Sequence, residues 1–75
     1  MNKERLKRIA SLIESLRPLA ENLEAIQEEE QEYYDQMPES FQGSERGERS
    51  ADAIDALETS TSELNAIIES LEGIA

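Results

Sequence analysis

The sequence has no cysteine and no histidine, and only three of its 75 residues are aromatic. Without cysteine the chain can form no disulfide and offers no thiolate to a metal. Without histidine it lacks the commonest general base and transition-metal ligand. A chain this short buries only about 60% of the surface that its unfolded form exposes. Small folds usually need an additional source of stability, and oligomerisation is the one that this composition leaves open.

Basic residues are also scarce: seven Lys and Arg stand against 18 Asp and Glu, which gives a net charge of −11. A surface of this sign repels the phosphates of nucleic acids and the anionic lipids of a membrane, so we expect neither as a partner. No apolar run approaches the roughly 20 residues that a membrane span needs. Glu14 interrupts the apolar stretch near the N-terminus, and no signal-peptide cleavage site follows it. We therefore expect a cytoplasmic protein.

Apolar residues in the first half recur at gaps of three or four, which predicts an amphipathic helix over about residues 2–35. Pro18 lies inside this helix and is expected to kink it, because proline removes a backbone hydrogen bond and clashes with the preceding turn. Glu30 occupies the one inward-facing position of this helix that has no apolar residue. The residues predicted to face inward are Leu6, Ile9, Ile13 (with Leu12), Leu16, Leu19, Leu23, Ile26, Tyr33 and Met37.

The second half predicts a helix over about residues 44–74 whose inward positions alternate gaps of three and four, as in a heptad repeat. Ile67 and Ile74 add a second apolar stripe beside this seam. Two long helices joined by a connection of about residues 36–43 predict a single all-α domain, an antiparallel helical hairpin over residues 1–75. The second stripe predicts that two hairpins dimerise into a four-helix bundle. The seam consists of Ile54, Leu57, Thr61, Leu64, Ile68, Leu71 and Ala75.

The connection has its own local signals. Pro38 is suited to open a single helical turn over residues 38–42, and Gly43 to end it in the left-handed conformation. Ser44 is then the predicted N-cap of the second helix, with Ser50 as the alternative.

Four basic residues crowd the start of the first helix, which is the unfavourable end for cations in the field of the helix dipole. In a hairpin this end lies near the end of the second helix, so we predict ion pairs with Glu69 and Glu72. The alternative is a basic contact patch for a partner. The four residues are Lys3, Arg5, Lys7 and Arg8.

Two acidic motifs raise the question of catalysis. Glu28, Glu29 and Glu32 form E-E-x-x-E, and Asp52 and Asp55 form D-x-x-D. The pair resembles the carboxylate motifs of the all-α nucleotide pyrophosphohydrolases, which implies Mg²⁺ held against phosphates. Helical phase instead turns these carboxylates outward and leaves only Glu30 facing in. We therefore predict no enzyme, no metal and no cofactor, and keep a Mg²⁺-dependent pyrophosphohydrolase as a secondary alternative.

The segment Tyr33–Arg49, "YYDQMPESFQGSERGER", holds every aromatic residue and the only basic residues after Arg17. Phenol rings, guanidinium groups and a helix N-terminus are components of sites for planar ligands that carry phosphate. The candidate ligand-binding residues are Tyr33, Tyr34, Gly43, Ser44, Arg46 and Arg49.

A purely structural interpretation of the same segment places Tyr33 against Gly47 and closes the tip of the bundle with Tyr34, Met37 and Phe41. In that interpretation Arg46 and Arg49 pair with neighbouring carboxylates, namely Asp35, Glu39 or Glu45.

The stretch "YYDQMPESFQGSERGE", followed by an alanine-rich and acidic helix, resembles a family of small helical proteins from bacteria, prophages and phages. The resemblance covers residues 33–48 and implies an accessory protein of a mobile element, acting in the host cytoplasm if a phage encodes it. Such a protein is expected to bind a host component at the loop end, such as a nucleotide signal that it sequesters. The alternative is a protein-interaction module, either an acidic inhibitor or an assembly adaptor.

Overall fold

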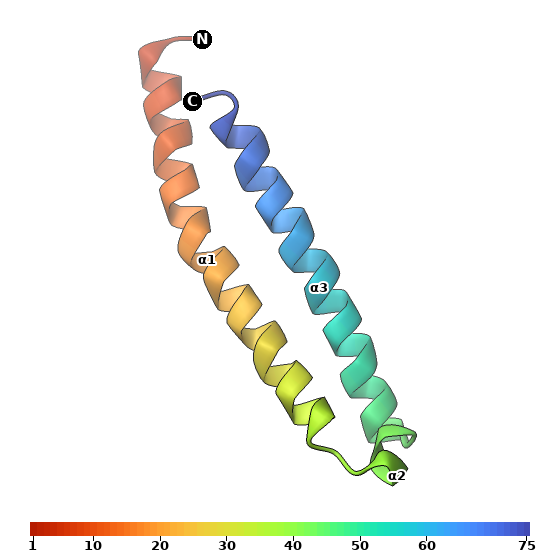
Figure 1. Ribbon diagram of the computed structural model, residues 1–75. Coiled ribbons are helices and arrows are strands. Elements are labelled where there is room, and N and C mark those ends of the chain that lie inside the picture. The colour runs from red at the N-terminus through yellow and green to blue at the C-terminus, as the bar shows by residue number, and fades with distance from the viewer.

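The computed structural model describes all 75 residues and contains helices but no strands. The helices are α1 (Lys3–Asp35), α2 (Glu39–Gln42) and α3 (Glu45–Glu72). The helices α1 and α3 run antiparallel along a narrow rod of 58 × 15 × 14 Å, and α2 forms the corner between them (Figure 1). The prediction of an all-α helical hairpin is confirmed.

Side chains at the helix starts accept hydrogen bonds from backbone N–H groups that no preceding turn can satisfy. Asn2 Oδ1 accepts from the Arg5 N–H at 2.8 Å at the start of α1. Ser44 Oγ accepts from the Gly47 N–H at 3.4 Å at the start of α3. Ser44 is therefore the N-cap, as predicted, and the alternative cap, Ser50, lies inside α3.

The helix α1 continues unbroken through Pro18. Figure 1 shows it curving gently in this part of the chain, with no separation into two helices.

The contact between α1 and α3 follows a heptad seam on both helices. On α3 the predicted seam from Ile54 to Leu71 is buried or partly buried, and it extends back to Gly47 and Ser50, whereas Ala75 is exposed. Thr61 fits the seam because its hydroxyl donates to the Leu57 carbonyl oxygen at 2.8 Å. On α1 the seam is Leu6, Ile9, Ile13, Leu16, Ala20, Leu23, Gln27, Glu30, Tyr34 and Met37.

This seam corrects the predicted inner face of α1. Leu19, Ile26 and Tyr33 are exposed, and the residue that follows each of them takes the inward position. Two adjacent rows of residues on α1 repeat every seven positions, one through Leu19 and Ile26 and the other through Ala20 and Gln27. The first row is more apolar, so hydrophobicity alone predicts that it faces the interior. The row that packs against α3 is the adjacent one, because it alternates gaps of three and four without interruption.

The hairpin leaves a large apolar surface uncovered. Only four hydrophobic residues are buried, namely Ile13, Ala20, Ile54 and Ile68. Six large hydrophobic side chains, each between 46% and 56% exposed, recur at intervals of seven residues beside the seam. In an antiparallel pair, residues that immediately precede the seam on either helix lie on the same side of the hairpin. We call this surface the apolar face, formed by Leu12, Leu19, Ile26, Tyr33, Ile67 and Ile74.

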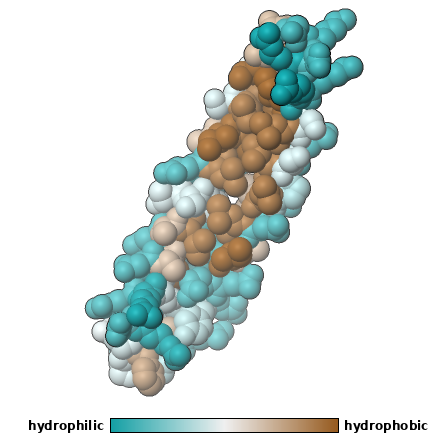
Figure 2. Space-filling model, turned by 180° about the vertical axis from the view of Figure 1, so that it is seen from behind, coloured by the Kyte–Doolittle hydropathy of each residue, from teal (hydrophilic) through white to brown (hydrophobic).

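Figure 2 shows this face as a band of hydrophobic atoms along one side of the rod, with hydrophilic atoms beyond both of its ends. The exposure of Ile67 and Ile74 agrees with the second stripe predicted on α3, and α1 adds four residues to it.

The predicted ion pairs at the basic end are wrong. Glu72 pairs with Arg17, and no ion pair involves the basic residues from Lys3 to Arg8. The reason is the difference in helix length: α1 has 33 residues and α3 has 28. The start of α1 therefore extends beyond the end of α3, as the positions of the termini in Figure 1 show.

Candidate functional site

The corner is held together by α2 and its hydrogen bonds to both long helices. Gln42 Nε2 donates to the carbonyl oxygens of Tyr34 at 3.1 Å and Met37 at 3.3 Å, at the end of α1. The backbone N–H of Ser44 donates to the Phe41 carbonyl oxygen at 3.0 Å. Pro38 is the N-cap of α2, one position before the predicted helix start. These bonds fix the positions of the residues in the candidate segment.

Gly43 does not adopt the predicted left-handed conformation, since its φ is −83° and no residue in the chain has positive φ. The chain turns through right-handed residues and α2 instead. A Cβ built on Gly43 meets nothing within 4 Å. A side chain is therefore compatible with the structure at this position.

Gly47 is the glycine that the corner requires. A Cβ at this position would lie 2.1 Å from the Gln42 carbonyl oxygen and 2.5 Å from that of Phe41. The close approach is thus between α3 and the backbone of α2, and the predicted packing of the Tyr33 ring on Gly47 is wrong. Phe41 is 56% exposed and does not close the tip, whereas Tyr34 and Met37 are partly buried there.

Three of the six candidate residues meet in one depression. Tyr33 comes from the end of α1, and Arg46 and Arg49 from the first turns of α3. The depression has a volume of about 420 Å³, and we call it the corner groove. Its lining is Glu30, Tyr33, Glu45, Arg46, Arg49, Ser50 and Ala53. A second depression of about 310 Å³ adjoins it and shares Tyr33 and Arg46.

The other three candidates serve the fold. Tyr34 lies in the seam of α1 and is partly buried. The backbone N–H groups of Gly43 and Ser44 are directed at the Phe41 carbonyl oxygen, so they are not free to bind a ligand. The Ser44 hydroxyl is used as the N-cap and also donates to the Phe41 carbonyl oxygen.

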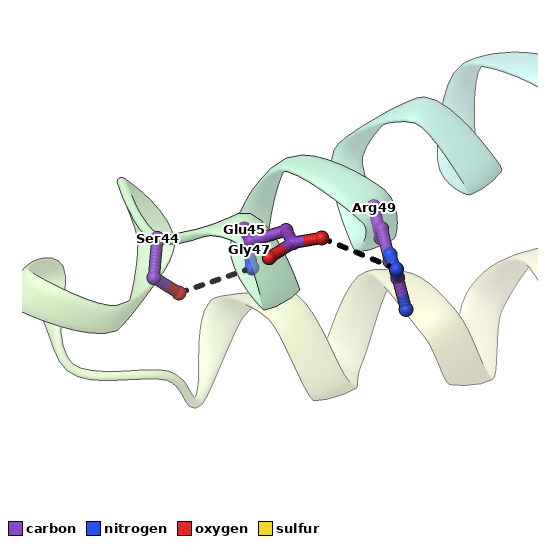
Figure 3. A network of polar contacts seen from close by, with 4 residues as sticks. All are labelled: Ser44, Glu45, Gly47 and Arg49. Atoms are coloured by element: carbon purple, nitrogen blue, oxygen red, sulfur yellow. Dashed lines mark hydrogen bonds and ion pairs between the residues drawn. The ribbon is translucent and has the colours of Figure 1, made fainter.

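The two arginines of the corner groove differ in their partners. Arg49 Nη2 lies 3.2 Å from Glu45 Oε1 one turn earlier on α3, next to the Ser44 cap (Figure 3). More than 80% of each of these side chains is exposed, so the pair contributes little to stability. Arg46 makes no ion pair. The expected pairing with a neighbouring carboxylate therefore holds for Arg49 and Glu45 and not for Arg46.

Glu30 lies on the inner side of the groove, as its helical phase predicts. Its Oε2 accepts a hydrogen bond of 2.6 Å from Ser50 Oγ, and Ser50 is only 4% exposed. This hydrogen bond replaces some of the contacts with water that the carboxylate loses on partial burial. Ser50, Glu45 and Ala53 also line the groove and were not among the predicted site residues. The only sequence signal for Ser50 was its inward position on α3, opposite Glu30, the one acidic residue at an inward position of α1.

The acidic motifs do not converge on a metal site. Glu28, Glu29, Glu32, Asp52 and Asp55 are all exposed, as helical phase predicts for the outer surfaces. No group of three or more acidic residues is placed to hold a metal ion.

None of the three helices combines the length and the apolar character that crossing a bilayer requires. No protein-family model, curated protein or solved structure matches the chain.

Proposed function

We propose that this protein is a non-enzymatic, homo-oligomeric binding protein. Two hairpins pack through their apolar faces into a four-helix bundle, and the corner of each hairpin binds a component of the host cell. The observation that carries the proposal is the apolar face, where six large hydrophobic side chains remain about half exposed. Covering such surface is favourable by about 25 cal/mol per Å². A single hairpin buries too few side chains to be a stable domain of its own.

Thermal melting at several protein concentrations tests this self-association. If folding and dimerisation are linked, the melting temperature must rise with protein concentration, because mass action favours the associated state. Circular dichroism at 222 nm would follow the helix content over a hundredfold range of concentration. A melting temperature that stays constant over that range would contradict the proposal.

We propose a phosphate-bearing small molecule with a planar ring, such as a nucleotide, as the occupant of the corner groove. The support is the meeting of an exposed Tyr33 ring with two guanidinium groups, of which Arg46 has no acidic partner. Such rings stack on planar ligands, and guanidinium groups bind phosphate through paired hydrogen bonds. The volume of about 420 Å³ is within the usual range for small-molecule sites. Glu30 and Glu45 oppose an anion, so the ring is expected to supply much of the affinity.

Nucleotide binding is tested by melting the protein with a panel of mono-, di- and cyclic nucleotides. A ligand at a hundredfold excess over its Kd raises stability by about 2.7 kcal/mol. The variant Arg46→Ala should lose the shift. Arg17→Ala is the matched control, because it removes an exposed positive charge that pairs with Glu72 and does not line the groove, and it should keep the shift. If the shift survives in Arg46→Ala, or if no nucleotide raises the melting temperature, this ligand class is excluded from the groove.

The alternative occupant of the corner is a host protein, for which the protein acts as an acidic inhibitor or an adaptor. The support is the exposed acidic surface near the corner, which includes Glu28, Glu32 and Asp52. Complexes formed through exposed charges weaken with salt because the charges are screened. Under either alternative, the resemblance of residues 33–48 favours an accessory protein of a phage or prophage.

A further inference from the structure

Charge is distributed unevenly along the rod. Residues 24–59, which form the corner half of the hairpin, contain twelve acidic and two basic residues, a net charge of −10. The remaining residues, which form the half with both termini, contain six acidic and five basic residues, a net charge of −1. One end of the molecule is therefore strongly acidic, and the other is close to neutral.

The apolar face connects these two ends. At the terminal end, Arg5 and Arg8 line a depression of about 370 Å³ together with Ile9 and Leu12, the first residue of the face. These arginines lie on the part of α1 that extends beyond α3, and neither makes an ion pair. At the other end, Tyr33 leads into the corner groove, which contains Glu30 and Glu45. The face thus begins beside unpaired cations and ends in the acidic half.

We propose that two copies pair side by side across the apolar face with their rods pointing in opposite directions, an arrangement that we call head-to-tail. The basic start of α1 in each protomer then lies beside the acidic corner half of its partner. This inference rests on the self-association proposed above and specifies its geometry. Pairing in the same direction would bring two halves of charge −10 together, and like charges at short range oppose association. Head-to-tail pairing brings each −10 half against a −1 half, which greatly reduces this repulsion, and a two-fold axis gives the same contact at both ends.

The length of the face is compatible with a second copy as the occupant. From Leu12 to Tyr33 it spans roughly 32 Å of α1, at 1.5 Å per residue. A stable interface buries about 800 Å² on each partner, which is about a seventh of the 5713 Å² surface of one hairpin. The midpoint of the face lies near Asn22, so a two-fold axis at this level aligns the two faces and leaves each Tyr33 at an end of the interface, beside its own corner groove.

Distances between spin labels distinguish the two orientations, and the absence of native cysteine allows a single label for each chain. Ser40→Cys places the label on α2 at the corner, at an exposed position. In a head-to-tail dimer the two labels should be separated by a distance close to the 58 Å length of the rod. In a same-direction dimer they should be separated by roughly 20–25 Å, the width of two packed helices with their side chains.

Asn22→Cys is the matched control, because Asn22 is exposed and lies near the midpoint of the face. This label should give a short distance in either orientation. A short distance at Asn22 with a long one at Ser40 supports the inference, and short distances at both sites overturn it while leaving self-association intact. No dipolar coupling at either site, together with the mass of a single chain in sedimentation, overturns the proposed self-association as well.

Discussion

Replacing Gly47 with alanine should destabilise the hairpin by about 3 kcal/mol, the upper end of the cost of overpacking a close contact. The new Cβ would lie 2.1 Å from the Gln42 carbonyl oxygen and 2.5 Å from its carbonyl carbon. Both are backbone atoms, so no change of rotamer relieves the clash and α2 must move. That movement would break the bonds from Gln42 to the end of α1. Small domains have free energies of unfolding from about 5 kcal/mol upward, so a loss of this size would remove a large part of the total stability.

Gly43→Ala is the matched control for this prediction. Gly43 has an ordinary right-handed φ of −83° and no atom within 4 Å of a built Cβ. Alanine there should change stability by no more than about 0.5–1 kcal/mol, with a gain expected because it restricts the unfolded chain. Urea denaturation at one protein concentration measures both variants. Equal losses for the two would mean that the corner is not packed as described.

Replacing Leu19 with glutamate should separate the dimer and, because folding and dimerisation are linked, lower the helix content at the same protein concentration. Leu19 is 56% exposed in one hairpin, so the substitution costs a single chain little by itself. Across the proposed interface the same side chain would place a charge in an apolar contact, at a cost of several kcal/mol. We therefore expect at least a hundredfold increase in the dimer dissociation constant, measured by sedimentation equilibrium.

The control for Leu19→Glu is Ser11→Glu, which adds the same charge at an exposed position outside the apolar face. It should leave the dissociation constant within a few fold of the unchanged protein, since exposed charges at a distance are screened. If Leu19→Glu and Ser11→Glu have the same effect, the apolar face is not the interface.

The sequence predicted the hairpin, the seam of α3 and the Ser44 cap because each depends on local or strictly periodic signals. It did not predict which row of α1 packs against α3. Leu19 and Ala20, like Ile26 and Gln27, belong to two adjacent rows that both repeat every seven residues. Hydrophobicity favours the first row and regular spacing favours the second. The choice depends on a partner surface that a single helix does not reveal.

Two predictions, one at each end of the hairpin, were wrong because they depend on contacts between segments that are distant in the sequence. Conformational preference marks Gly43 as the special glycine because it follows a helical turn. The requirement at Gly47 arises only when α2 folds back onto α3. The expected ion pairs at the basic end assumed helices of equal length, and the five additional residues of α1 carry those cations past the end of α3.

The candidate site was predicted in part. Their proximity in one short segment was enough to group Tyr33, Arg46 and Arg49, which the structure brings into one groove, although helical phase wrongly placed Tyr33 inward. Tyr34, Gly43 and Ser44 were added because their rings or N–H groups looked available, and packing and capping use them instead. The contact between Glu30 and Ser50 requires the antiparallel register, which periodicity alone does not determine to the residue.

Sedimentation equilibrium of the unchanged protein at micromolar concentration tests most directly the claim that the apolar face is covered by a second copy. One chain has a mass of 8.5 kDa. The protein should have twice that mass, and its dissociation on dilution should be accompanied by loss of helix. A species of 8.5 kDa that remains helical and unfolds cooperatively at the same concentration would contradict it.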